Sequence, residues 1–204
     1  SFGGSNSKLT QAVVRLINAG GGTPMPSQIE MKAQNVPASF QDVAAPVIMA
    51  VADAVEGRDQ ALSSAGWGTT QRKNAFEGAP YLMLPGTSSQ VAAAPDLSQA
   101  SVVSTYAAFP TDKLVQEAAD LAATVSQETQ GVSGSGWTGF SFVVDTPVGK
   151  VVLGDANATS YDPSMQSQYG GDIAVLIDAG GKDTYRVGAG GNGSASNGVS
   201  LLLD

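Results

Sequence analysis

The sequence has neither cysteine nor histidine among its 204 residues. These absences exclude disulfides, thiol nucleophiles, Ser-His-Asp triads and nearly every zinc, copper or haem site, because each needs a thiolate or an imidazole. Basic residues are also scarce: 10 Lys and Arg stand against 18 Asp and Glu, which leaves a formal net charge of −8. This sign opposes binding to a phosphate backbone, so we expect no nucleic-acid partner.

Long apolar runs are missing too. The best one, 43–55, is interrupted by Pro46 and Asp53, whereas a membrane helix needs about 18 apolar residues, so no membrane insertion is expected. Residues 1–8 lack the basic start and apolar centre of a signal peptide. A cytosolic protein and a processed one both fit that absence. The missing initiator Met and cysteine, with only 14% charged residues, favour a processed protein that is extracellular or on the cell surface.

The chain has two parts of different composition. All five glutamates precede residue 130, and from Asp145 onward every acid is an aspartate. Glu favours helices, while Asp favours turns and caps. Glycine is also much denser after residue 130. We therefore predict a mainly helical region over 1–130, with an irregular segment at 64–110, and a β region over 131–204.

Apolar spacing predicts three helices in the first region. Residues 9–17 carry one apolar face, and the glycines at 20–22 end that helix. The second helix follows a capping-box-like motif at 39–42 and is expected to begin near Pro46, in its first turn. A third begins at Thr111 and ends at Gly131, with a predicted buried stripe formed by Leu114, Ala118, Leu121, Ala122 and Val125.

The second region opens with a hairpin signal and continues with a short internal repeat. Residues 137–145 and 150–153 flank a Thr-Pro-Val-Gly turn. Three apolar runs then close, at similar intervals, on Asp155, Asp178 and Asp204. The first two are followed by a Gly- or Asn-containing turn and a Ser/Thr-Tyr pair. A repeat period in the twenties predicts a parallel β-solenoid (β-helix or β-roll) on which the helical region packs, in an α+β fold; the alternative is a plain antiparallel sheet.

Residues 178–193 resemble the glycine-rich nonapeptide repeat of RTX, or haemolysin-type, calcium-binding proteins. Gly181 matches a motif glycine, Asp183 the aspartate and Tyr185 the apolar position. In the next nine residues Asn192 stands where the motif has an aspartate. The resemblance is to the turn, and it implies a calcium-binding β-roll in a secreted protein.

The residue types support that chemistry independently. Ca²⁺ takes six to eight oxygen ligands from carboxylates and carbonyls, and glycine lets carbonyls point inward. If the repeats stack, their carboxylates gather at one edge. The predicted Ca²⁺ ligands are Asp155, Asp178, Asp183, Asp204, Gly181 and Asn192. The alternative is that these aspartates bind their own backbone amides in Asx-turns, with Lys182 and Arg186 neutralising the cluster.

Three functions remain open from the sequence. The first is a secreted or surface structural protein with a calcium-stabilised solenoid that assembles through its C-terminal coil, either with another copy or with the remainder of a longer precursor. The second is a carbohydrate-active enzyme or polysaccharide-binding module, because two carboxylates suffice for glycoside hydrolysis. The third is a metal-free scaffold. No catalytic pair stands out, so an enzyme is the less favoured outcome.

Overall fold

The computed structural model describes residues 7–64, 110–130, 136–189 and 199–204. It contains two compact units, one made of 1–56 with 117–204 and the other of 57–116. The predicted irregular segment therefore lies almost wholly outside the described residues. In the second unit, the end of one helix and the start of another are described, and the Lys113 Nζ donates to the Ser64 Oγ at 3.3 Å.

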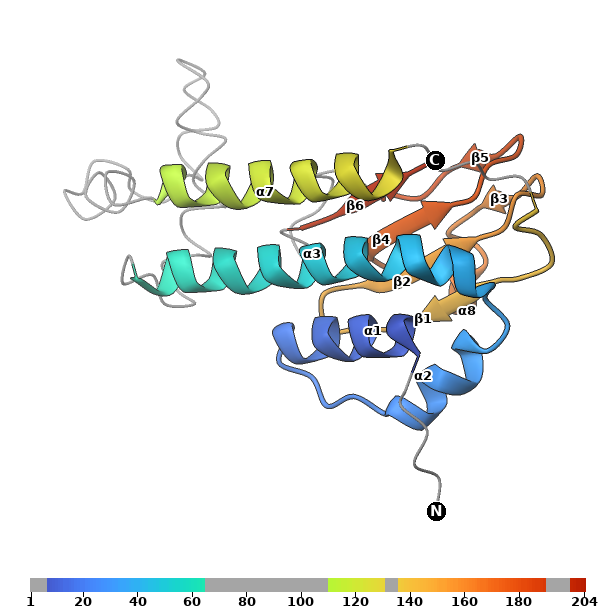
Figure 1. Ribbon diagram of the computed structural model, residues 1–204, viewed down its shortest axis with the longest axis horizontal. Coiled ribbons are helices and arrows are strands. Elements are labelled where there is room, and N and C mark those ends of the chain that lie inside the picture. The colour runs from blue at the N-terminus through green and yellow to red at the C-terminus, as the bar shows by residue number, and fades with distance from the viewer. Residues whose placement is uncertain (1–6, 65–109, 131–135, 190–198) are drawn as a thin grey trace, which may run out of the picture. The chain divides into compact units, whose positions relative to one another are not determined.

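The described residues up to 129 form helices, and the strands follow from Phe142 onward, with one short helix among them (Figure 1). The described helices are α1 (Lys8–Ala19), α2 (Pro26–Ala33), α3 (Ala38–Ser64), α7 (Thr111–Thr129) and the short α8 (Gln166–Tyr169). The strands are β1 (Phe142–Val144), β2 (Lys150–Gly154), β3 (Ser160–Tyr161), β4 (Ile173–Asp178), β5 (Thr184–Tyr185) and β6 (Leu201–Leu203). The protein is thus of the α+β class.

The prediction that α3 begins near Pro46 is wrong, because the helix begins at Ala38 and Pro46 lies inside it. Tertiary packing stabilises the extra turns. Phe40 is buried, and its ring contacts those of Trp137 and Phe140 with centroids 4.9 and 5.0 Å apart. The side chain of Gln41 also donates to two carbonyls that precede the helix. These contacts outweigh the missing amide of a mid-helix proline.

The predicted buried stripe of α7 is also wrong, since no residue of this helix is buried. Leu121 and Val125 are half-buried against the core, whereas Ala118 and Ala122 are exposed. Apolar spacing predicts which face a helix turns toward a neighbour, but it does not fix how completely the neighbour covers that face. The sequence reasoning also placed no helix where α2 lies.

The main sheet is mixed, with the strand order β1-β2-β4-β6. The hairpin prediction is confirmed, because β1 and β2 are antiparallel. β4 is parallel to β2, and β6 is parallel to β4. The three apolar runs that close on aspartates therefore lie side by side in parallel, as the repeat predicts. β3 and β5 form a second, two-stranded parallel sheet, in which Ser160 is opposite Thr184 and Tyr161 opposite Tyr185.

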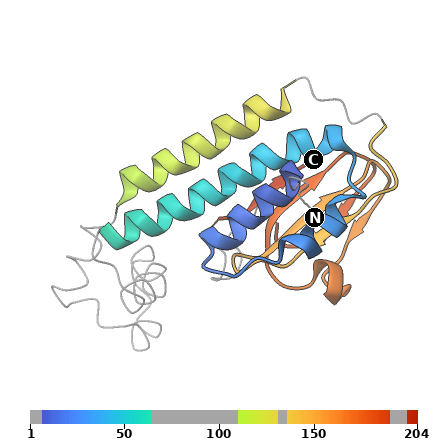
Figure 2. The ribbon, with the colours of Figure 1, turned by 60° about the horizontal axis from the view of Figure 1, so that its bottom comes forward.

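The main sheet has a hydrophobic cluster on each face. On one face, residues from α1, α2 and α3 pack against alternate strand residues such as Phe142, Leu153 and Val175; Figure 2 shows α1 and the first part of α3 over the same side of the strands. On the other face, Val152 and Leu176 pack with tyrosines from the second sheet and α8. Both faces are apolar because parallel strands that are covered on two sides have no row of side chains facing solvent.

Helix α3 is long and apolar enough to cross a membrane, by length and composition alone. Half of its most apolar 18-residue window is buried inside the protein, and the core helix of a folded domain meets the same two criteria.

Candidate functional site

Three aspartates of the repeat converge at one edge of the sheets. Asp178 is the last residue of β4, Asp183 lies in the turn before β5, and Asp204 follows β6. Each offers a carboxylate oxygen, and these oxygens all lie within 4.8 Å of one another. We call Asp178, Asp183 and Asp204 the acidic triad.

The sequence produces this convergence through register and turn geometry. Ile177 is opposite Leu203 in the parallel pair, so the residues that follow them, Asp178 and Asp204, are neighbours. Gly180 and Gly181 then reverse the chain with φ angles of 113° and 137°. Residues with a Cβ rarely adopt such angles. This turn returns Asp183 to the end of the strand that Asp178 closes.

Asp178 is the buried member of the triad, with 6% of its surface exposed. Its Oδ2 accepts a short hydrogen bond from the Tyr161 hydroxyl, and its Oδ1 accepts one from the Gly180 amide at 2.8 Å. Burial raises the pKa of Asp178; the two hydrogen bonds oppose that rise, and the charges of the other triad members add to it. The site therefore concentrates negative charge where water screens it poorly.

Asp183 has one satisfied oxygen and one unsatisfied oxygen. Its Oδ1 accepts a hydrogen bond from the Thr159 amide at 2.6 Å. Its Oδ2 is buried and accepts no hydrogen bond from the part of the chain that the structure describes. A Cβ at Gly181 would lie only 2.9 Å from this oxygen, so glycine leaves the space beside it open. A buried carboxylate oxygen without a donor is costly, and this one requires an explanation.

Tyrosine rings line the same region. Tyr161 and Tyr185 stack face to face across the parallel pair β3·β5, with centroids 5.1 Å apart and planes 3° apart. Tyr169 of α8 meets Tyr161 edge-on. Burial is the main cause that raises the pKa of both Tyr161 and Tyr185, and the Asp178 carboxylate contributes to each rise. Both hydroxyls therefore remain protonated in neutral solution.

Gly154 makes the Tyr161–Asp178 bond possible. A Cβ at this position would overlap the Tyr161 hydroxyl and lie 2.8 Å from the Asp178 Oδ2. Sequence reasoning missed Tyr161 and Gly154 as members of the site. The recurring Ser/Thr-Tyr pair was the signal for the tyrosine, because parallel register places equivalent residues of the two units side by side.

The other predicted ligands have different surroundings. Asp155 is outside the acidic triad, and its carboxylate accepts hydrogen bonds from the Gly139 amide and the Asn157 side chain, both at 2.5 Å. It also accepts one from the Asn157 amide at 3.3 Å. Asp155 thus makes the Asx-turn that was the alternative to metal binding, and Asp178 makes the same turn through the Gly180 amide. Gly181 borders the triad, and Asn192 lies outside the described residues.

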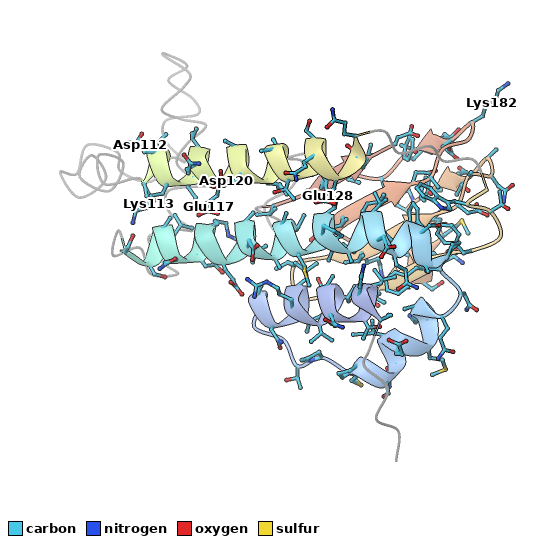
Figure 3. The ribbon with its side chains drawn as sticks, viewed as in Figure 1. Asp112, Lys113, Glu117, Asp120, Glu128 and Lys182 are labelled. Carbon is cyan, nitrogen blue, oxygen red and sulfur yellow. The ribbon has the colours of Figure 1, made fainter. Side chains whose placement is uncertain are left out.

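The two nearby cations do not form ion pairs with the triad in the described structure. Arg186 pairs with Asp162, with 3.1 Å between the Arg186 Nη1 and the Asp162 Oδ2. Lys182 is exposed, and its side chain points away from the protein (Figure 3). The triad's charge is therefore not balanced by a described basic side chain.

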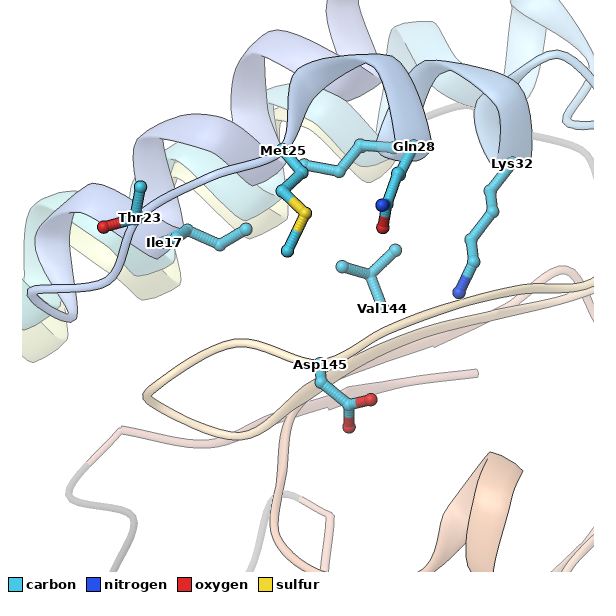
Figure 4. Close-up of a pocket in the computed structure, with 8 residues that line it drawn as sticks. Ile17, Thr23, Met25, Gln28, Lys32, Val144 and Asp145 are labelled. Atoms are coloured by element: carbon cyan, nitrogen blue, oxygen red, sulfur yellow. The ribbon is translucent and has the colours of Figure 1, made fainter.

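A separate cavity of about 280 Å³ lies between the start of α2 and the end of β1 (Figure 4). It is lined by Ile17, Thr23, Met25, Gln28, Ile29, Lys32, Val144 and Asp145. Its two charged groups are already bound elsewhere: Lys32 donates to the Val143 carbonyl, and Asp145 pairs with Lys150. This cavity offers a ligand no convergent set of polar groups.

Comparisons with known proteins found no match: no family model, no curated protein and no solved structure is similar to the chain. The RTX resemblance of the turn therefore stays a prediction.

Proposed function

We propose that the acidic triad binds Ca²⁺ between neighbouring strand-turn units, and that these units are the rungs of a β-solenoid in a structural protein of the cell surface or extracellular space. The observation that carries the proposal is the convergence of the three carboxylates within 4.8 Å, one of them with a buried oxygen that lacks a donor.

The chemistry of the donor set favours a hard cation. Three carboxylates supply oxygen ligands, and the described site has neither sulfur nor nitrogen ligands. Without a cation, three carboxylates this close repel one another, and the repulsion is strongest for buried Asp178. A divalent cation would relieve the repulsion and satisfy the Asp183 Oδ2 in one step.

The arrangement of strands supports the solenoid part of the proposal. Val151 pairs with Val175 and Ser160 with Thr184, so both sheets repeat at the same offset along the chain. Val175 pairs in turn with Leu201, which continues the first sheet at nearly that offset. Stacked coils of a solenoid have this pattern of parallel neighbours at a nearly constant offset. Location outside the cell rests on composition alone.

Thermal melting in calcium and in EDTA tests the metal proposal. A ligand at 100 times its Kd stabilises a protein by about 2.7 kcal/mol, which corresponds to a rise in Tm of about 5–10 °C for a chain of this size. D183N should lose most of this rise. D145N is the matched control, because Asp145 is an exposed carboxylate outside the triad.

Equal Tm values in calcium and EDTA would overturn the metal proposal and leave the metal-free scaffold. A calcium shift that survives in D183N would place the ion elsewhere. Equal shifts with Mg²⁺ would contradict a flexible site of the calcium type, because Mg²⁺ demands near-ideal octahedral geometry.

The carbohydrate alternative gains no support from the triad. Glycosidases hold two carboxyl groups about 5–9.5 Å apart across an open cleft. Here Asp178 is buried and bound to Tyr161, so it is not open to a substrate.

A further inference from the structure

A lysine from α2 occupies one edge of the main sheet. The Gly154 carbonyl accepts the Ala179 amide at 3.2 Å and so faces β4. Backbone groups alternate sides along a strand, so those of Leu153 face β1, and the Val143 carbonyl faces away from β2. At this outer edge the Lys32 Nζ from α2 donates to the Val143 carbonyl at 2.7 Å. A lysine on an edge strand opposes pairing with another strand.

The first tyrosine of the second sheet packs against a ring from α8. Tyr161 of β3 is completely buried, and Tyr169 of α8 packs edge-on against its ring. A described side chain thus occupies the outer edge of the main sheet at β1.

The opposite edges differ. Among the described strands, β6 pairs with β4 alone and β5 with β3 alone. All three residues of β6 are half-buried. The Tyr185 ring is half-buried and stacks on Tyr161, and its buried hydroxyl lies beside the Asp204 carboxylate. This surface continues the interface by which each strand-turn unit already packs on the one before it.

We propose that the β5 and β6 edges bind a further strand-turn unit of the same chemistry: an apolar strand parallel to β6, and a Thr-Tyr or Ser-Tyr strand whose tyrosine stacks on Tyr185. This inference rests on the solenoid part of the proposed function and commits to the kind of partner.

A second copy of this chain does not supply that unit. The copy's own first strand in the main sheet, β1, has Lys32 on its outer edge, which opposes pairing with another strand. The β5 and β6 edges of the copy would face the β5 and β6 edges of the first chain. Identical strands would then pair, and no successive unit would be added in parallel register. The occupant is therefore polypeptide with the repeat's own pattern and an uncovered first strand.

The test extends the full chain at Asp204 by a second copy of the sequence 179–204. With all measurements in EDTA, we expect a rise in Tm of about 5 °C and protection of the added segment from proteolysis. The matched control has the same extension with its Tyr and three Leu replaced by Ser, and it should give neither effect. Y185A is then made both with and without the extension. The extension should raise the Tm of the Y185A variant much less than it raises the Tm of the parent chain.

An extension that leaves Tm unchanged and stays sensitive to protease would overturn the inference. Sedimentation of the unextended chain tests the other occupant: concentration-dependent dimers that Y185A abolishes would make a second copy the partner instead. Because the extension is measured in EDTA, its failure is distinct from failure of the calcium proposal, which is measured on the unextended chain.

Discussion

The contact between Tyr161 and Asp178 joins two successive units of the repeat at the level of single atoms. Tyr161 belongs to the unit that begins with β2, and Asp178 closes the next strand. Gly154 leaves the space in which their oxygens meet. Loss of the Tyr161 hydroxyl or of the Asp178 carboxylate leaves the other group buried with fewer partners, which is costly. A side chain at position 154 would have the same effect by separating them.

Gly154→Ala should destabilise the protein by about 2–4 kcal/mol, because the new methyl group would displace the Tyr161 hydroxyl from Asp178. Urea denaturation measures the change. Gly188→Ala is the control, since a Cβ there meets nothing within 4 Å. A G154A variant as stable as G188A would show that the Tyr161–Asp178 contact contributes little.

Tyr161→Phe should cost about 1–3 kcal/mol, because Asp178 would lose a donor while it stays buried. Tyr185→Phe should cost less, since the carboxylate beside the Tyr185 hydroxyl, that of Asp204, is exposed, whereas Asp178 is buried. Urea denaturation of both variants measures the two costs. Equal costs for the two variants would contradict this account.

At the scale of elements, the parallel order of β2, β4 and β6 follows from the repeat. Protection of the sheet against pairing with another strand comes instead from a helix. α2 covers the outer edge of β1 through Lys32. The ion pair of Lys8 with Asp42, by contrast, is exposed and joins only helices. Substitution of these two lysines should therefore have different effects on self-association.

Lys32→Met should uncover the Val143 carbonyl and strengthen self-association about tenfold, which corresponds to about 1.4 kcal/mol. Met keeps most of the aliphatic stem, so α2 should still pack. Sedimentation equilibrium measures the association constant, and Lys8→Met is the control. If K32M and K8M sediment alike, Lys32 does not protect the β1 edge.

The repeat allowed prediction of the neighbouring parallel strands because similar spacing of apolar runs and closing aspartates translates into register. It also placed Asp178, Asp183 and Asp204 at one edge. It did not distinguish Asp155, whose carboxylate is bound by Gly139, a residue outside the repeat. The start of α3 and the exposure of α7 were missed for a related reason: both depend on tertiary neighbours, such as Trp137 against Phe40, that local spacing does not encode.

At the scale of the whole molecule, acids outnumber bases by eight. Several described ion pairs are exposed, among them Lys8–Asp42 and Arg15–Asp53. Exposed pairs of this kind contribute at most about 1 kcal/mol each. Self-repulsion among the remaining acids should therefore determine how salt changes stability.

Raising NaCl from about 20 mM to about 0.5 M in EDTA should increase Tm by about 2–4 °C, because screening reduces repulsion more than it weakens the exposed ion pairs. Differential scanning calorimetry measures the shift. A Tm that falls with added salt would mean that ion pairs outweigh the net charge in the folded state.

The regular offset between paired strands also bears on how the chain folds. β4 pairs with β2, the strand of the unit before it, and β6 pairs with β4 in the same way. Each pairing therefore closes only a modest loop, however many units precede it, and the entropic cost per unit does not grow with chain length. Folding can thus advance in the direction of synthesis, with each newly emerged strand adding to a template that is already formed.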